Sequence, residues 1–392
     1  MFNVGIDIAK YKHDFAIIDE QGLIVVPPKT ISNSQEGFND LLVALSSLDC
    51  SQEIKIGLEA TGHYGSNLKA FLTKHGFNYV ELNPLKVLRF HQQISLRRTK
   101  TDKVDCIVIA QFISTKNNKA KSYQQPLYHL EALKSLTRLR ETYVSQRSLI
   151  LVKMTNVLDA VFPEFKAFFS NKLKSNTALY ILKKYKTPLR ISKWNEQDLI
   201  DVHNVSRRIP ISKLDDLREI ASNTIGISSS FLTQELLSLI RMYEALNKEV
   251  TAIEKEIINI MSTIDSPTAS IPGIGLVSAA TIISEFGDFA KFDSQTQCVA
   301  YAGLDAGISQ SGTKCFKGKM VKRGSSHLRY VLMNVVKMVC IHNDTFKSYW
   351  KKKKVREHKN MRVADSHTAK KLIRLIYHLE TNQIKFDPLL SR

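Results

Sequence analysis

Two short apolar runs near the N-terminus each end in an acidic residue, and this pattern constrains the fold more than any other feature of the chain. Val4-Gly5-Ile6 leads to Asp7, and Ile56-Gly57-Leu58 leads to Glu59. Short runs rich in Ile and Val are typical of buried strands. An unpaired acid is uncommon in such a strand, so the two carboxylates are expected to lie at strand ends with a role beyond solubility.

Two further acids follow in Lys100-Thr101-Asp102-Lys103-Val104-Asp105. This segment reads as helix, where Asp102 and Asp105, three residues apart, share one face. Gathered carboxylates repel each other unless a cation lies between them, and Mg²⁺ is the hard ion that prefers oxygen ligands. Two such ions can clamp a phosphodiester during cleavage. The four acids therefore predict a ribonuclease-H-like, RuvC-type nuclease core, although any one acid taken alone fits a solvated surface.

The charge balance favours a polyanionic partner. The 392 residues carry a formal net charge of +19, with a pI of about 9.6. Residues 86–121 hold nine Lys/Arg against two Asp, and residues 314–362 hold fifteen against two acids. The first 60 residues hold four Lys against nine acids. Solvated surfaces normally intersperse both signs, so the basic segments are expected to contact phosphates next to an acidic metal site.

Residues 1–125 alternate between strand and helix patterns. Strands are expected over Phe2–Ile8, His13–Ile18, Leu23–Lys29, Ile54–Glu59 and Phe77–Leu82. Helices are expected over Ser34–Leu48, over Ser66–His75 and from Pro84 onward. The sequence thus predicts an α/β domain, a mixed sheet with helices around it.

Two long helices are predicted in the middle of the chain. Residues 129–162 lack Gly, and a later stretch repeats apolar residues in steps of four and three, a heptad seam. Its positions are Leu232, Leu236, Leu239, Tyr243, Leu246, Val250, Ile253, Ile257 and Ile260. The seam is expected to form an antiparallel coiled coil between the two helices or a contact between protomers; a helix packed within one domain is the alternative. Residues 164–230 read as helical and show no chemistry.

A second site is suggested in the C-terminal third. Ile271-Pro272-Gly273-Ile274-Gly275 resembles a helix-hairpin-helix, whose glycines let backbone N–H groups approach a phosphate. Ser311 lies in a Gly-rich loop among cations, where positive charge favours an alkoxide attacking a phosphodiester. Spacing alone is weak here, because Gly/Ser loops are mostly turns.

Nucleic-acid contacts are expected from basic and glycine residues that flank the two sites. They are Arg97, Arg98, Lys100, Gly273, Gly275, Lys314, Lys317, Lys319, Lys322, Arg323 and Arg329. The four lysines at 351–354 are expected to extend this surface, although charge runs are usually solvated.

The domain organisation follows from these segments. We expect a RuvC-like domain at 1–125, a helical coiled-coil region at 126–263, a mainly α serine domain at 264–345 and a basic helical tail at 346–392. The five scattered cysteines lack zinc or disulfide spacing. The chain opens directly into a strand and shows no apolar run of membrane-spanning length, so a cytoplasmic protein without a membrane partner is expected.

The ordered motifs resemble those of one family, the insertion-sequence transposases with an Asp-Glu-Asp-Asp N-terminal domain (the IS-one-ten family), which includes pilin-gene invertases and bridge-RNA-guided recombinases. The matching pieces span residues 3 to 329. They are Gly5-Ile6-Asp7-Ile8-Ala9-Lys10, Glu59-Ala60-Thr61-Gly62, the Lys100–Asp105 segment, the Ile271–Gly275 segment, Ala300-Tyr301-Ala302-Gly303-Leu304, Ser311-Gly312, Lys322-Arg323-Gly324 and Leu328-Arg329.

The resemblance implies roles for these residues. Asp7, Glu59, Asp102 and Asp105 match the family's Mg²⁺-binding acids, and Ser311 matches its nucleophile. It also implies DNA recombination without host-site duplication and guidance by a structured RNA that pairs with donor and target. Dimers and tetramers are implied, with one site built from the RuvC-like domain of one subunit and the serine domain of another.

Three departures and two alternative functions accompany the resemblance. Cys106, Ala306 and Ser325 stand where the family usually has Ala, Pro and Asn, and none removes a catalytic group. Ser309 lies two residues before Ser311, so it competes as nucleophile. A Holliday-junction-type nuclease using water is the alternative enzyme, and a non-catalytic DNA-organising protein is the alternative from another class. A resolvase has no need of the Ser311 loop, and a binding protein has no need of four gathered acids.

Overall fold

The structure is a computed structural model that describes residues 1–49, 51–59, 62–82, 84–94, 102–115, 128–170, 173–205, 207–311 and 314–388. Contacts divide the chain into two compact units. The first comprises Met1–Leu130 together with Gly287–Asp293, which holds the 3₁₀ turn Phe289–Lys291. The second comprises Glu131–Phe286 and Ser294–Arg392.

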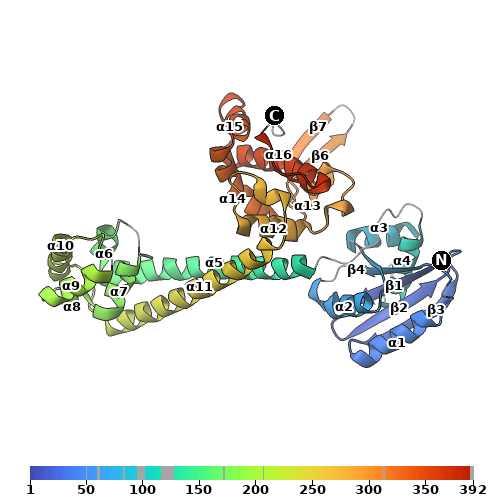
Figure 1. The fold of residues 1–392 in the computed structure, drawn as a ribbon, viewed down its shortest axis with the longest axis horizontal. Coiled ribbons are helices and arrows are strands. Elements are labelled where there is room, and N and C mark those ends of the chain that lie inside the picture. Colours follow the sequence, from blue (N-terminus) through green and yellow to red (C-terminus); the bar gives the residue numbers. More distant parts are fainter. Residues whose placement is uncertain are drawn as a thin grey trace. The chain divides into compact units, whose positions relative to one another are not determined.

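The first unit is built on a five-stranded mixed sheet of order β3-β2-β1-β4-β5. The strands are β1 (Phe2–Ile8), β2 (Lys12–Ile18), β3 (Ile24–Ser32), β4 (Ile54–Glu59) and β5 (Tyr79–Leu82). β1, β2 and β3 form an antiparallel meander, and β4 and β5 continue the sheet parallel to β1 (Figure 1). The predicted α/β class of this region is confirmed.

Helices cover both faces of this sheet. The even-numbered residues of β1 belong to a core with Phe38 and Leu41 of α1 (Gln35–Ser46) and with Leu68 of α2 (Ser66–Lys74), which follows the 3₁₀ turn Gly62–Gly65. Side chains of α4 (Asp102–Ser114) pack with β5 and α3 (Pro84–Ile94) in a second core. α4 packs against β1, β2 and β4. The central strands β1, β2 and β4 are therefore largely buried, as their apolar runs predict, whereas the edge strand β3 is mostly exposed.

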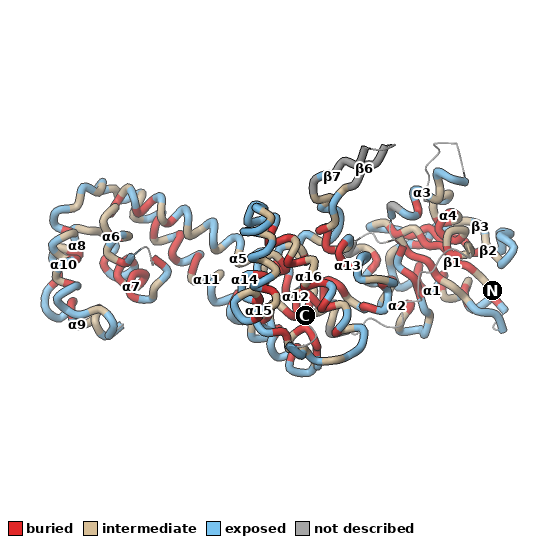
Figure 2. The backbone as a smooth tube through the Cα atoms, turned by 90° about the horizontal axis from the view of Figure 1, so that it is seen from above, coloured by how far each residue is buried: buried red, intermediate tan, exposed pale blue. Residues whose placement is uncertain are grey.

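Two long helices, α5 (Tyr128–Val161) and α11 (Ser230–Ser262), pair in the second unit. Arg140 Nε donates to Glu254 Oε1 at 2.7 Å, and Arg147 Nη1 donates to Asn247 Oδ1 at 2.7 Å. From the first contact to the second, the residue number rises by seven on α5 and falls by seven on α11, so the two helices run antiparallel. Most predicted seam positions of α11 are buried, as Figure 2 indicates for this helix. Their pairing within the chain supports the intramolecular form of the seam.

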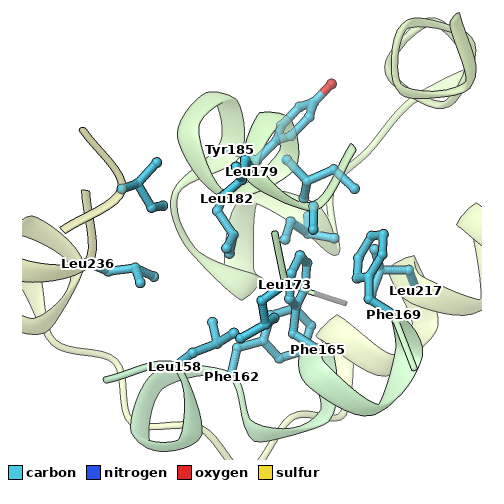
Figure 3. Close-up of a cluster of buried hydrophobic side chains, with 14 of the residues drawn as sticks. Leu158, Phe162, Phe165, Phe169, Leu173, Leu179, Leu182, Tyr185, Leu217 and Leu236 are labelled. Carbon is cyan, nitrogen blue, oxygen red and sulfur yellow. The ribbon is translucent and has the colours of Figure 1, made fainter. Parts of the chain in front are cut away.

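Five short helices join the ends of the long pair and form a cap. They are α6 (Pro163–Phe168), α7 (Asn176–Tyr185), α8 (Pro188–Ile191), α9 (Glu196–Val205) and α10 (Ile211–Ser222). Their apolar side chains share one core with α5 and α11, in which the rings of Phe162, Phe165 and Phe169 contact one another in succession at tilted angles (Figure 3). The cap and the adjoining ends of α5 and α11 thus form one hydrophobic core, in a region that the sequence predicted only as helical.

The C-terminal domain is mainly helical. Its elements are a 3₁₀ turn at Pro267–Ser270, α12 (Leu276–Phe286), α13 (Gln295–Tyr301), the hairpin β6 (Ala306–Ser311) and β7 (Lys314–Met320), α14 (Ser326–His342), α15 (Asp344–Lys351), a π-helical turn at Lys352–Arg356 and α16 (Met361–Asn382). α16 packs against α13, α14 and α15, with Leu372, Ile373 and Ile376 fully buried. Residues after 345, expected as a tail, instead contribute a core helix, because α16 has an apolar face that the lysine-rich composition obscured.

No helix in the described part of the chain is both long and apolar enough to cross a lipid bilayer.

Candidate functional site

Asp7 and Glu59 lie at one edge of the sheet. β1 and β4 are parallel neighbours with Ile6 opposite Leu58, so the next residues, Asp7 and Glu59, lie at the same edge of the sheet. Glu59 ends β4, and Asp7 is the last residue but one of β1. Both residues are half-buried. The carboxyl ends of parallel strands are where α/β sheets hold their functional groups. The strand ends are therefore placed as the sequence predicted.

α4 approaches the sheet beside these acids. A Cβ atom on Gly5 would lie 2.1 Å from the Cys106 carbonyl oxygen and 2.4 Å from the Ala110 nitrogen. Only glycine lets the helix backbone come this close to β1. The contact brings the turn of α4 that contains Cys106, one residue after Asp105, against β1. Asp102 begins α4, and its side chain lies outside the described residues.

A fifth acid, Asp14, belongs to the same region and was missed in the sequence. It lies opposite Asp7 in the β1–β2 ladder, so both side chains point to one face of the sheet. Asp14 is only 2% exposed. Thr30 Oγ1 donates to its Oδ1 at 2.5 Å, and Lys12 Nζ lies 3.6 Å from Oδ2. The sequence does hold a hint of this residue, because Asp14 directly precedes the apolar run Phe15–Ile18. A hairpin pattern alone, however, does not show whether such an acid is buried or lies on the surface.

The Cys106 thiol reports the electrostatics of this face. Burial raises its pKa to about 12, and the negative charges of Asp14 and Asp7 act in the same direction. The two carboxylates are thus close enough to α4 to disfavour a further negative charge. Such a face is a suitable environment for a cation.

The donor chemistry of the region fits a hard metal ion, because every candidate ligand is a carboxylate. Among the side chains that the structure describes, no three His, Cys, Asp or Glu residues form a group able to hold a metal. Asp102 is outside that set, so the four-acid site remains a prediction.

The predicted nucleophile ends a β-strand in the C-terminal domain. Ser311 is the last residue of β6 and pairs with Lys314 of β7; Ser309 pairs with Phe316. The side chains of these residues, and those of Lys317 and Lys319, lie outside the described set. The segment expected to be a loop therefore contains two paired strands. Its glycine-rich composition, which is typical of turns, gave no strand signal.

Backbone contacts brace the base of this hairpin. The Val321 N–H donates to the Asp305 carbonyl at 3.0 Å, and the Ser325 N–H donates to the Tyr301 carbonyl at 3.0 Å. Arg329 Nη1 donates to the carbonyls of Ala302 at 3.3 Å and Lys322 at 3.4 Å. Arg329, predicted to contact nucleic acid, thus uses part of its guanidinium to tie the two ends of the hairpin together. Lys322 and Arg323 are exposed.

A buried ion pair supports the same base. Glu285 of α12 has a fully enclosed side chain and receives two hydrogen bonds from Arg138 of α5, at 2.6 and 3.0 Å. Ser325 Oγ donates to Glu285 at 2.7 Å and also caps α14. Burial raises the Glu285 pKa, but the bonds from Arg138 and Ser325 outweigh it and leave the pKa below its ordinary value. No sequence signal linked these residues, since Arg138 and Glu285 are 147 positions apart.

The two glycines of the helix-hairpin-helix pattern occupy different environments. A Cβ atom on Gly273, which has φ +94°, would lie 2.6 Å from the Val339 nitrogen and 2.7 Å from the Met338 carbonyl group. Gly273 therefore lets the hairpin turn pack on the backbone of α14. Gly275 precedes α12, is exposed, and has open space where a side chain would be. Of the two, Gly275 is the one free to approach a phosphate.

The remaining basic candidates fall in three groups. Arg97, Arg98 and Lys100 lie outside the described residues. In the lysine run, Lys351, Lys352 and Lys354 are exposed. Lys353 instead donates to both oxygens of Glu357, at 2.8 and 3.0 Å.

Comparisons with known proteins agree with this arrangement. A model of the DEDD-type IS110 transposases, described as "Transposase", matches residues 4–163, and a model described as "Transposase IS116/IS110/IS902 family" matches residues 266–351. The IS117 mini-circle protein of Streptomyces coelicolor, named as a putative transposase, is 25% identical over 80% of this chain and 78% of its own length. The pilin gene-inverting protein of Moraxella bovis is 23% identical over 84% of this chain and 80% of its own length.

The two matched segments coincide with the two places where the candidate residues gather: one contains the strand-end acids and α4, and the other contains the braced hairpin. The cap lies between them, almost wholly outside both matches. The chain belongs to the IS110 family of insertion-sequence transposases and is a DNA transposase or recombinase.

Proposed function

We propose that this transposase cuts and rejoins DNA through a transient covalent bond to Ser311, with Mg²⁺ held by Asp7, Glu59, Asp102 and Asp105. The observation that supports the proposal is that Asp7 and Glu59 lie at the same edge of two parallel strands, while α4, which begins with Asp102, packs closely on β1 at Gly5. Family membership supports the same interpretation, because the matched segments include all five residues.

The covalent step conserves the phosphodiester. The Ser311 oxygen forms a new ester bond to phosphorus, one sugar oxygen of the DNA leaves, and that oxygen takes up a proton. In the reverse step, a sugar hydroxyl of a second DNA strand attacks the phosphorus of this serine ester. The DNA is thereby rejoined, and the serine oxygen leaves and takes up a proton. A serine hydroxyl is a weak nucleophile, so a base must accept its proton. The braced base of the hairpin supports this role by fixing the approach of β6 to the phosphate.

The acids supply the electrostatic part of the reaction. When bound, Mg²⁺ would neutralise charge on the phosphate oxygens. Asp7 and Glu59 would hold the ion from the sheet, and Asp102 and Asp105 from the helix. Asp14 lies on the same face and adds negative charge without being required as a ligand.

A structured bridge RNA and a second protomer complete the proposal. The family resemblance supports both, and the exposed lysines of the C-terminal domain suit a polyanionic partner. Sequencing the RNA that copurifies with the protein would test the guide: one dominant species from the element's own noncoding end is expected, whereas an unselective mixture of cellular RNA contradicts guidance.

The nucleophile is tested by trapping the covalent adduct on a labelled, nicked DNA substrate. Ser311→Ala should bind DNA with unchanged affinity and form no adduct on denaturing gels. Ser309→Ala is the matched control and should retain the adduct. An adduct that survives Ser311→Ala, or maps to Ser309 by mass spectrometry, moves the nucleophile. Cleavage without any adduct in the unchanged protein favours the water-dependent junction nuclease.

The metal site is tested by Asp102→Asn. Loss of one ligand charge should abolish strand exchange in Mg²⁺ and weaken Mn²⁺ binding by at least about tenfold, the usual effect of disturbing a metal site. Asp40→Asn on the exposed side of α1 is the control for surface charge. Full strand exchange by Asp102→Asn, with its metal affinity unchanged, would remove Asp102 from the site.

A further inference from the structure

A pocket of about 750 Å³ lies where the cap meets the two long helices. Arg147, Ser148 and Leu151 line it from α5, and Tyr243, Glu244, Asn247 and Lys248 line it from α11. Four residues around the start of α7 close the third side: Lys174, Ser175, Asn176 and Leu179. The pocket is far in sequence from the five proposed catalytic residues, and the proposed reaction makes no use of it.

The lining is cationic. Arg147, Lys174 and Lys248 contribute three positive charges, and Lys174 and Lys248 are exposed and make no ion pair within the described residues. The one acid, Glu244, is neutralised from outside the pocket by Lys183 Nζ, at 2.8 and 3.0 Å. Negative charge entering the pocket would therefore meet a surplus of unpaired cations.

The start of α7 adds backbone donors to this charge. α7 has ten residues, and its N-cap Ser175 accepts from the Ala178 N–H. Asn176, the first residue of the helix, lines the pocket, and its N–H group has no partner within the helix. Helix N-termini carry partial positive charge and bind phosphate groups.

Tyr243 provides an independent indication that a ligand belongs here. Its side chain lines the pocket and is only 6% exposed. Its hydroxyl makes no hydrogen bond within the described part of the chain. The ring is enclosed, but the hydroxyl oxygen is not among the fully enclosed polar atoms without a partner. The hydroxyl is therefore a fixed, uncommitted donor at the pocket, which an oxygen of a bound ligand could accept.

We propose that this pocket binds a backbone phosphate of nucleic acid, with Lys174 and Lys248 as charge partners and the Tyr243 hydroxyl and α7 N–H groups as donors. Leu151 and Leu179 form an apolar wall against which a sugar or base can pack. The protein's +19 charge and its action on DNA favour a strand over an isolated ion. The proposal is independent of which serine is the nucleophile.

Lysine footprinting on the full-length protein tests the site directly. Acetylation by an N-hydroxysuccinimide ester is followed by mass spectrometry, without ligand and with duplex DNA, structured RNA or inorganic phosphate. Lys174 and Lys248 should react at least about threefold more slowly with saturating DNA or RNA, since a phosphate contact displaces solvent from the ammonium groups. Lys153 and Lys255, on the same helices outside the pocket, are the controls. The nucleic acid that slows acetylation of Lys174 and Lys248 is identified as the ligand, duplex DNA or structured RNA.

Substitutions supply the second measurement. Lys174→Gln with Lys248→Gln should lower the slope of log affinity against log salt by about one phosphate contact. Tyr243→Phe should weaken binding by at least about tenfold, as expected when one hydrogen bond to a charged group is removed. Tyr180→Phe, on α7 outside the pocket, should change nothing. Protection by inorganic phosphate alone, or no protection by any ligand, would overturn the proposal, as would unchanged binding by both pocket variants with their circular dichroism preserved.

Discussion

At the scale of single residues, the ion pair between Arg138 and Glu285 is unequal. The Glu285 side chain is fully enclosed, whereas that of Arg138 is 44% exposed. Removing the arginine strands a charge away from water, but removing the glutamate leaves a guanidinium that water can still reach. The energetic consequences of the two deletions should therefore differ.

Arg138→Ala should destabilise the protein by about 2–4 kcal/mol, since it leaves a buried carboxylate with Ser325 and the nearby Lys134 as its remaining partners. Glu285→Gln should cost less, about 1–2 kcal/mol. Urea unfolding monitored by circular dichroism measures both. Equal destabilisation by the two variants would show that the guanidinium is as dependent on the pair as the carboxylate.

The same pair makes stability depend on pH. The folded-state pKa of Glu285 lies below the ordinary glutamate value of 4.5. A lowered pKa contributes stability that is complete above pH 4.5 and is lost as pH falls through the folded value. The difference in unfolding free energy between the unchanged protein and Glu285→Gln should therefore shrink below pH 4.5.

At the scale of elements, the lysine run at the end of α15 divides into two kinds of side chain. Lys351, Lys352 and Lys354 project as free charges, whereas Lys353 is held by Glu357. Phosphate binding by counterion release draws on free charges, because a paired lysine must first give up its partner. The run is therefore expected to act through three lysines rather than four.

Replacing Lys351, Lys352 and Lys354 by Gln should lower the salt slope of DNA affinity by about one to three, because each lysine that neutralises a phosphate adds nearly one to that slope. The control replaces the exposed cap lysines Lys186, Lys193 and Lys213, which removes the same net charge. Fluorescence anisotropy across a salt series measures both triple variants. Identical slopes for the two would mean that the run acts only through net charge.

At the scale of the whole molecule, the local sequence pattern predicted where helices and strands lie better than it predicted which of them pack together. β1 and β4 have the predicted bounds, and both long helices lie within two residues of theirs, because apolar periodicity is a local property. The partners of Arg138, the place of Asp14 beside Asp7 and the burial of α16 depend on contacts between distant segments. Periodicity along one element carries no information about such contacts.

Association between protomers is the whole-molecule prediction that the seam allows. Leu246 is half-buried, although Tyr243 and Val250 on either side of it are buried. If a second protomer covers the seam here, Leu246→Asp should halve the mass in light scattering, because a charge in the contact must be desolvated. Ile258→Asp, at an exposed position of α11, is the control. An unchanged mass in folded Leu246→Asp leaves the seam wholly intramolecular.

The contacts between α5 and α11 repeat at an interval of one heptad, so the length of the helical pair can change in steps of seven residues. Seven residues separate Arg140 from Arg147, and seven separate their partners Glu254 and Asn247. Deleting one heptad from both helices would preserve every facing pair and draw the cap about 10 Å along the axis, at 1.5 Å per residue. Deleting it from one helix would break the register. The span between the cap pocket and the C-terminal domain is therefore adjustable in paired steps, and a nucleic acid that touches both would have to match one of them.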